Sequence, residues 1–235
     1  NEIDGLMRQT RLRRFASRSR VRAEMSDPSA LPADPDTSTR ALLRERDYLV
    51  FWGARFVGTL GVQIQAVALG WQVYAIARQT MSVGESAFMV SMIGLAQFAP
   101  LFLLTLIAGE TADRRSRKHI AMITLAIDIV SVSVLLFMAL RGIHALWPIF
   151  TMAVFFGASR AFMSPAVSAM GPMLVPRALL PRAIAWNSLA WQSASIAGPA
   201  LGGLLLVHSA GLAFGGAAAL YALGLVLLSA IRQSP

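Results

Sequence analysis

Three ionisable residues, Arg55, Asp128 and Arg160, lie inside long apolar runs of the sequence. A charge at the centre of a bilayer costs about 2.5–3.5 kcal/mol on insertion scales, and such residues commonly mark ion or substrate pathways. Counted from the turn near Ile143, Asp128 lies 15 residues back and Arg160 lies 17 residues on. At about 1.5 Å per helical residue the two side chains reach nearly the same depth, so an ion pair between them is geometrically feasible.

Each of these charges has two interpretations. Asp128 could carry a coupling proton, or it could form a structural pair with an arginine. Arg55 lies roughly 9 Å inside its apolar run, so it could line a pathway or extend to the membrane interface. The same choice, pathway lining or hydrogen bonding between helices, applies to four polar residues of the apolar runs: Gln63, Gln65, Asn187 and Gln192.

The sequence holds no pattern typical of an enzyme. It contains no phosphate-binding glycine loop, no His-Glu-x-x-His motif and no paired carboxylates outside the N-terminal arm. Cysteine is absent, which excludes disulfides and cysteine-ligated metals, and the three histidines are far apart. We therefore expect no enzymatic activity, no metal site and no cofactor.

The elements that position these residues are predicted to be membrane helices. Of the 235 residues, 56% are hydrophobic and only 14% are charged, and the mean hydropathy is +0.59. A soluble domain carries about a quarter charged residues. Six apolar runs are long enough to cross a bilayer as helices, at about residues 49–77, 87–108, 120–140, 146–167, 183–207 and 212–231. The fold class predicted is all-α membrane, with residues 47–235 forming a six-span bundle.

The preceding residues, 1–46, have a different character. They are polar, carry ten arginines and show no useful periodicity, so we expect a disordered basic arm. Met25 opens the sequence Met-Ser-Asp-Pro and could be the native start, with the residues before it being upstream sequence.

The basic residues are distributed unequally between the two ends of the predicted spans. The end that holds the N-terminal arm has 17 Lys and Arg residues, whereas the opposite end has only Arg78 and Arg141. Because cytoplasmic loops are enriched in Lys and Arg, both termini are predicted to be cytoplasmic. The net charge of +9 is then explained by anionic lipid headgroups, and no nucleic-acid partner is expected.

The loop between the second and third spans carries a specific motif. A glycine is followed four residues later by Asp-Arg and then by a basic pair: Gly109, Asp113, Arg114, Arg117 and Lys118. This pattern resembles the signature of the major facilitator superfamily at the same loop. It departs from the signature at Ser116, where the family usually has glycine, and at Thr111, which is usually apolar. The resemblance implies a latch on the cytoplasmic side.

A second motif lies in the fifth span. Gly198, Pro199, Gly202 and Gly203 resemble the Gly-Pro-x-x-Gly-Gly motif of antiporters in the same superfamily, although position 194 is alanine where the fuller motif has glycine. A proline bends a helix and glycines permit close packing, so such a segment can act as a seal or pivot. The stretch from Ala161 to Asn187 is also similar to the enterobactin-exporter-like branch, whose members are mostly proton-driven exporters of siderophores or drugs.

Together these resemblances imply the N-terminal half of a secondary transporter. The implied fold is two inverted three-helix repeats that work by alternating access. The implied function is proton-driven efflux of a small molecule across the bacterial inner membrane. A missing C-terminal six-helix half, or a second copy, would complete the pathway. The alternative is a truncated half-transporter without transport activity, acting at most as a membrane scaffold or interaction module.

Overall fold

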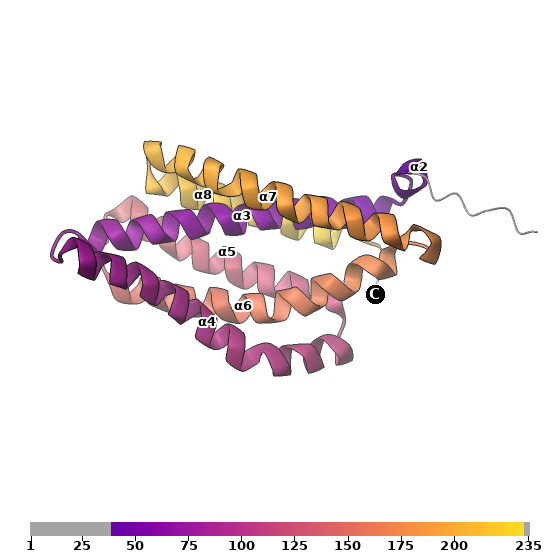
Figure 1. Cartoon of the computed structure of the whole chain (residues 1–235), viewed down its shortest axis with the longest axis horizontal. Helices are drawn as coiled ribbons and strands as arrows, with labels where there is room; N and C mark the ends of the chain where they lie inside the picture. The colour runs from indigo at the N-terminus through magenta and orange to yellow at the C-terminus, as the bar shows by residue number, and fades with distance from the viewer. Residues whose placement is uncertain (1–38, 233–235) are drawn as a thin grey trace, which may run out of the picture. The chain divides into compact units, whose positions relative to one another are not determined.

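The computed structural model describes residues 39–232, and all regular secondary structure in that range is helical (Figure 1). The α-helices are α2 (Thr39–Leu42), α3 (Arg46–Ala77), α4 (Val83–Arg114), α5 (Arg117–Arg141), α6 (Leu146–Met170), α7 (Leu180–His208) and α8 (Ala210–Ser229). Two short 3-10 helices, η1 (Gly171–Leu174) and η2 (Arg177–Leu179), connect α6 to α7. The predicted all-α membrane class is confirmed, because α3 to α8 are each long and apolar enough to cross a bilayer.

Helix ends differ from the predicted ones where polar residues cap the helix. The second span was predicted to begin at residue 87, but α4 begins at Val83. Ser82 accepts a hydrogen bond from the Glu85 backbone N–H, and the Glu85 carboxylate accepts one from the Ser82 backbone N–H. This capping box satisfies donors at the helix start, so the helix extends beyond its apolar run.

The junction with the N-terminal arm is more structured than the composition indicates. The disordered arm was predicted to extend to residue 46, but Thr39–Leu42 form α2 and Arg46 already belongs to α3. The Leu42 side chain is 0% exposed and belongs to the hydrophobic core. Burial of this apolar side chain therefore orders the last residues of the arm. The predictions for residues 1–38, including a start at Met25, lie outside the described residues.

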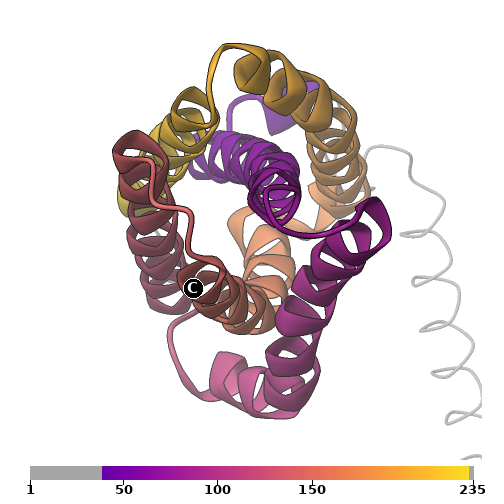
Figure 2. The ribbon, with the colours of Figure 1, turned by 90° about the vertical axis from the view of Figure 1, so that its left-hand side faces the viewer.

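The six long helices pack in a pattern with internal symmetry. Helix α3 packs mainly against α7 and α8, and α6 packs mainly against α4 and α5. Exchanging α3 with α6, α4 with α7 and α5 with α8 converts one set of neighbours into the other. This is the arrangement expected of two three-helix repeats, and an odd number of spans per repeat inverts the second one. In the end-on view, α3 lies between the α7–α8 pair and α6 (Figure 2).

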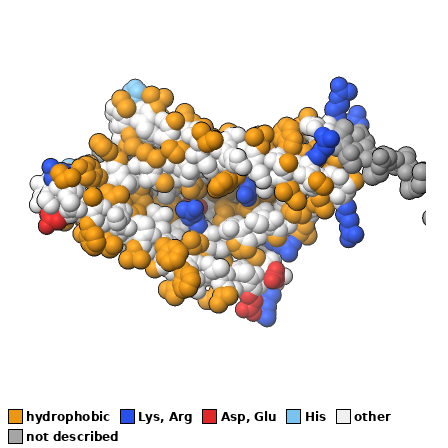
Figure 3. Space-filling model, in the orientation of Figure 1, with side chains coloured by type: hydrophobic (Ala, Val, Ile, Leu, Met, Phe, Trp, Pro, Cys, Tyr) orange, Lys and Arg blue, Asp and Glu red, His pale blue; other side chains and the backbone are white. Residues whose placement is uncertain are grey.

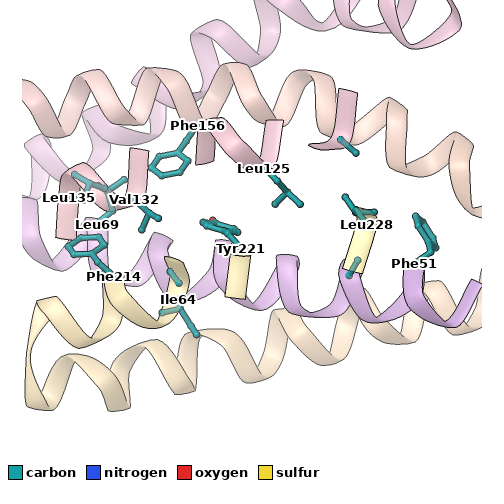
Figure 4. Packing of buried hydrophobic residues seen from close by; sticks show 14 of the residues in the cluster. Phe51, Ile64, Leu69, Leu125, Val132, Leu135, Phe156, Phe214, Tyr221 and Leu228 are labelled. Atoms are coloured by element: carbon teal, nitrogen blue, oxygen red, sulfur yellow. The ribbon is translucent and has the colours of Figure 1, made fainter. Parts of the chain in front are cut away.

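The hydrophobic core lies inside the bundle, and large apolar side chains also cover its outside. Figure 4 shows Phe51, Leu125, Tyr221 and Phe214 packed between α3, α5 and α8. On the outer face of α4, apolar side chains point away from the core, and Leu106 is 85% exposed. Apolar side chains likewise cover much of the visible surface in Figure 3. An apolar exterior of this extent requires a lipid surround.

Candidate functional site

A cavity of about 260 Å³ lies between α3, α5, α6, α7 and α8. Apolar residues and polar or charged residues line it in similar numbers, and such a mixture can hold an apolar body while polar groups orient it. The lining residues are Phe51, Ala54, Arg55, Gly58, Thr59, Val62, Gln63, Leu125, Asp128, Arg160, Met163, Ser164, Val167, Ser168, Trp191, Ser195, Tyr221 and Leu228.

The three intramembrane charges predicted from the sequence all line this cavity. Arg55 comes from α3, Asp128 from α5 and Arg160 from α6. The expectation that Asp128 and Arg160 reach a similar depth agrees with their shared cavity. Their side chains interact electrostatically, but in residues 39–232 no ion pair within 4.0 Å joins Asp128 to either arginine. A tight structural pair, one of the two interpretations of Asp128, is therefore not formed.

Asp128 is buried with incomplete hydrogen bonding. Its side chain is only 5% exposed, and its Oδ1 atom has no hydrogen-bond partner. Ser159 of α6 lies beside the carboxyl group, but the Ser159 hydroxyl donates to the Thr124 carbonyl at 3.1 Å. A buried polar atom without a partner is expensive, so it points to a role other than stability.

Gln63 links the cavity to the Gly-Pro motif of α7. Pro199 has no backbone N–H, so it cannot bond to the carbonyl of Ser195, four residues earlier in the helix. The Gln63 side-chain amide of α3 donates a hydrogen bond to this Ser195 carbonyl, with an Nε2–O distance of 3.4 Å. Gln63 therefore replaces the hydrogen bond that the proline removes.

Gln65 faces away from Gln63 and serves a structural role. It is buried, and its Oε1 atom accepts a hydrogen bond of 2.6 Å from the hydroxyl of Tyr221 in α8. The ring of Tyr221 packs against α3 at Gly61, where a Cβ atom would lie only 2.9 Å from the ring. Tyr221 also lines the cavity, which the sequence does not predict, because a single tyrosine in an apolar run carries no spacing signal.

Asn187 and Gln192, the other two polar candidates, do not line this cavity. Gln192 is exposed on α7, and Asn187 is partly buried with its Oδ1 atom unpartnered. Of the four polar residues considered as pathway lining, only Gln63 reaches the cavity. The neighbouring Trp191 also reaches it, with 52% of its side chain exposed.

The glycines of the Gly-Pro motif differ in their surroundings. A Cβ atom at Gly198 would overlap Gln63 of α3, and one at Gly202 would lie 3.1 Å from the Ile64 Cα atom. These two glycines therefore let α7 and α3 approach closely. Gly203 has open space around it, so it makes no such contact. In the other repeat, Gly157 of α6 packs in the same manner against the carbonyl of Gln97 in α4.

The residues of the loop motif separate into two groups. Lys118 Nζ donates to the carbonyls of Ser229 and Ile231, at 3.1 and 2.5 Å, where α8 ends. Arg117 contacts Met173 of η1 through a guanidinium–sulfur contact of 2.5 Å. These two residues join the loop to the rest of the bundle, and a cation at a helix C-terminus is favourable.

The other residues of the motif point outward. Gly109 has open space around it, and Asp113 is exposed and makes no hydrogen bond or ion pair within the described part of the chain. Arg114 forms an ion pair with Glu110 at 2.8 Å, one helical turn earlier. No hydrogen bond or ion pair therefore joins Asp113 to another helix within residues 39–232, and the latch implied by the resemblance stays a prediction.

Most basic residues of the connections lie at one end of the bundle, whereas Arg78 and Arg141 lie at the other. Besides the contacts of Arg117 and Lys118, the Arg232 backbone N–H donates to Asp47 at 3.2 Å, and Arg182 donates to Thr39 at 2.6 Å. At the opposite end, Gln79 lies 3.5 Å from His144. Figure 3 shows most of the visible basic side chains toward one end, with others midway along the visible face and at the opposite end.

Six apolar helices, five of which line a charged cavity, define a multi-pass membrane protein of the transporter type. The family model described as transmembrane secretion effector matches residues 37–234. The chain therefore belongs to this family, which is part of the major facilitator superfamily of membrane transporters. No curated protein matches the chain in a sequence comparison.

Proposed function

We propose that this chain forms the N-terminal six-helix bundle of a secondary active transporter that exports a small molecule by proton exchange. The observation that carries the proposal is the convergence of Arg55, Asp128 and Arg160 on one intramembrane cavity in a chain of a transporter family. Charged groups at this depth are costly and are retained where ions or substrates move. The resemblance to the enterobactin-exporter-like branch supports a siderophore or drug-like cargo.

Asp128 is the proposed proton carrier. A carboxyl group can bind and release a proton within the membrane, and the unpartnered Oδ1 atom leaves room for one. Its burial excludes bulk water, so proton access would depend on which side of the cavity is open. Arg160, which interacts electrostatically with Asp128, would favour release of the proton when the two approach.

The proposed mechanism is alternating access against a second bundle, either a C-terminal half or another copy. Asp113 lies exposed at the basic end and the space beside Gly109 is open, so both residues are available to contact such a partner as a latch. The close α7–α3 contact at Gly198 and Gly202, next to Pro199, would serve as the pivot or seal. Arg117 and Lys118 hold the latch loop to its own bundle.

We place the basic end of the bundle in the cytoplasm and the protein in the bacterial inner membrane. The support is the excess of Lys and Arg in the connections at that end, 17 against 2 over the whole sequence. In this orientation the latch loop faces the cytoplasm, together with both termini. Anionic headgroups of the cytoplasmic leaflet would bind the same residues.

The test is proton-coupled transport by the protein reconstituted in liposomes with an imposed pH gradient. A panel of siderophores and drug-like compounds is offered, and substrate-dependent proton flux is recorded with an internal pH dye. We expect at least one compound to elicit flux, and Asp128→Asn to reduce that flux by about tenfold or more, because the amide cannot carry the proton.

Glu85→Gln is the matched control, because it also removes one carboxylate but keeps the capping box at the start of α4. It should leave the flux unchanged. Unaltered proton coupling in Asp128→Asn would reject the carrier role of this residue. Absence of flux for every compound in the native protein would reject proton-coupled transport itself.

A further inference from the structure

The cavity carries more positive than negative charge. Two guanidinium groups, those of Arg55 and Arg160, share it with the single carboxyl group of Asp128. Asp128 interacts electrostatically with Arg160. Arg55 has no carboxylate partner within residues 39–232, so its charge is not compensated by the protein.

Arg55 is also incompletely hydrogen-bonded. Its Nε atom is buried and has no partner, although a guanidinium presents five donors in a fixed plane. The sequence left open whether this side chain extends to the membrane interface or lines a pathway, and in the structure it lines the cavity. The enclosed Nε atom is not open to a ligand, but the part of the Arg55 guanidinium that lines the cavity is suited to an acceptor that arrives with one.

The remaining walls indicate what else the ligand contains. Phe51, Val62 and Trp191 line the cavity together with other apolar side chains. Aromatic and aliphatic walls bind an apolar body, and a few fixed polar groups orient it. At about 260 Å³ the cavity accommodates an acidic group with an adjoining ring system rather than a large molecule in full.

From these observations we propose that the cavity selects organic anions, namely molecules with a carboxylate attached to an aromatic or other apolar body. The carboxylate binds the guanidinium of Arg55, assisted by Arg160, and the body packs on Val62 and Trp191. Arginine is suited to this role because its planar fork matches the two carboxylate oxygens. The proposal rests on the proposed transport function and specifies its substrate class.

The experiment compares three probes of nearly equal size and different charge: naphthylacetate, naphthylacetamide and naphthylethylammonium. Binding of each to the full chain in nanodiscs is measured by equilibrium dialysis, with empty nanodiscs subtracted for partition into lipid. Because hydrogen bonds between ionised groups are stronger than neutral ones, we expect the acid to bind about tenfold more tightly than the amide. The ammonium probe should bind weakest.

Variants assign the preference to particular residues. Arg55→Gln should bring the acid and the amide to within about threefold of each other, and Arg55→Lys should retain part of the preference because it keeps the charge. Arg141→Gln is the control, because Arg141 is an exposed arginine of the same bundle that contacts the Phe137 ring, remote from the cavity. It should leave the affinities of all three probes unchanged.

Several results would overturn the proposal: no binding of the acid, equal or tighter binding of the ammonium probe, or an acid preference that survives in Arg55→Gln. The binding assay requires no transport, so the two proposals can fail separately. Acid-selective binding without proton-coupled flux would leave the substrate class standing and reject the transport mechanism. Flux of neutral or cationic compounds without acid-selective binding would support proton-coupled transport and reject the proposed substrate class.

Discussion

At the scale of single residues, the two glutamines of α3 illustrate how position along a helix decides function. Gln63 and Gln65 are two positions apart, so they project about 200° apart around the helix axis. One donates to the Ser195 carbonyl beside the cavity, and the other accepts from Tyr221 in the protein interior. The amide of Gln63 therefore forms part of the cavity wall, whereas the amide of Gln65 joins α3 to α8.

The hydrogen bond between Tyr221 and Gln65 gives a prediction about stability. Tyr221 is only 1% exposed, so Tyr221→Phe leaves the Gln65 oxygen without its donor in an apolar interior. We expect a loss of about 1 kcal/mol in the free energy of unfolding, since such bonds in membrane bundles are worth about 0.6–2 kcal/mol. Unfolding in mixed detergent micelles measures this loss.

A double-mutant cycle separates this bond from packing effects. Gln65→Met removes the acceptor at nearly constant volume, and the effects of the two substitutions should then be less than additive. Full additivity would show that the hydroxyl stabilises nothing through Gln65. Tyr74→Phe is the comparison, because the Tyr74 hydroxyl has no partner among the described residues.

At the scale of elements, close helix crossings define the arrangement around the cavity. Gly198 and Gly202 bring α7 against α3, and Gly157 brings α6 against α4. These two crossings exchange under the same relation that exchanges the two repeats. Each crossing also involves a proline-containing helix, with Pro199 in α7 and Pro100 in α4.

Alanine substitutions in α7 are expected to have different effects on stability at two glycines of the same motif. A Cβ atom at position 198 overlaps Gln63, so Gly198→Ala should force the helices apart and lower stability by about 1–3 kcal/mol. At position 203 the space is open, so Gly203→Ala should be neutral or stabilise by up to about 1 kcal/mol through helix propensity. Thermal unfolding of both variants in detergent compares them directly.

Both substitutions add one methyl group to the same helix, so a difference in stability between the two variants measures the effect of the close α7–α3 contact. Equal effects would contradict the view that Gly198 is held by close contact. Transport assays on the same two variants would then test whether the crossing also serves as the proposed pivot.

Most of the elements are predictable from the sequence, but their mutual arrangement is not. Six spans follow from hydropathy because a bilayer requires about 20 apolar residues per helix. Burial of Leu42 against the bundle and the capping box at Ser82 are set by local contacts that hydropathy does not register. The cavity was predictable in part, since the depth of Asp128 and Arg160 can be counted along their helices.

The rest of the site depends on rotation about each helix axis. The helices have weak amphipathic patterns because lipid and core are both apolar, so the sequence does not show which face turns inward. The sequence therefore points to Gln192, which lies on an exposed face, and carries no signal for Tyr221, which lines the cavity.

At the scale of the whole bundle, the basic end is held together by contacts between segments remote in sequence. Lys118 at the start of α5 binds the carbonyls at the end of α8, and the Arg232 backbone binds Asp47 at the start of α3. These contacts connect the first repeat to the second.

Lys118→Met should loosen this connection, because it keeps most of the side-chain length but removes the charge and the donors. A cation at a helix C-terminus is worth about 0.3–1 kcal/mol, so amide hydrogen exchange in residues 226–232 should accelerate by up to about fivefold. Arg115→Met is the control, since Arg115 is an exposed neighbouring residue whose side chain makes no hydrogen bond, ion pair or ring contact within residues 39–232. Unchanged exchange in Lys118→Met would show that α8 ends independently of this residue.

The packing of α3 against α7 and α8 also bears on how the protein is made. The partners of Gln63 and Gln65 lie 132 and 156 residues further along the chain. At a synthesis rate of about 5–20 residues per second, α3 leaves the ribosome roughly 7–30 s before the helices that satisfy its polar groups. During that interval Arg55 and both glutamines need another environment. The insertion machinery must therefore shelter α3, or hold it at the membrane interface, until α8 has been synthesised.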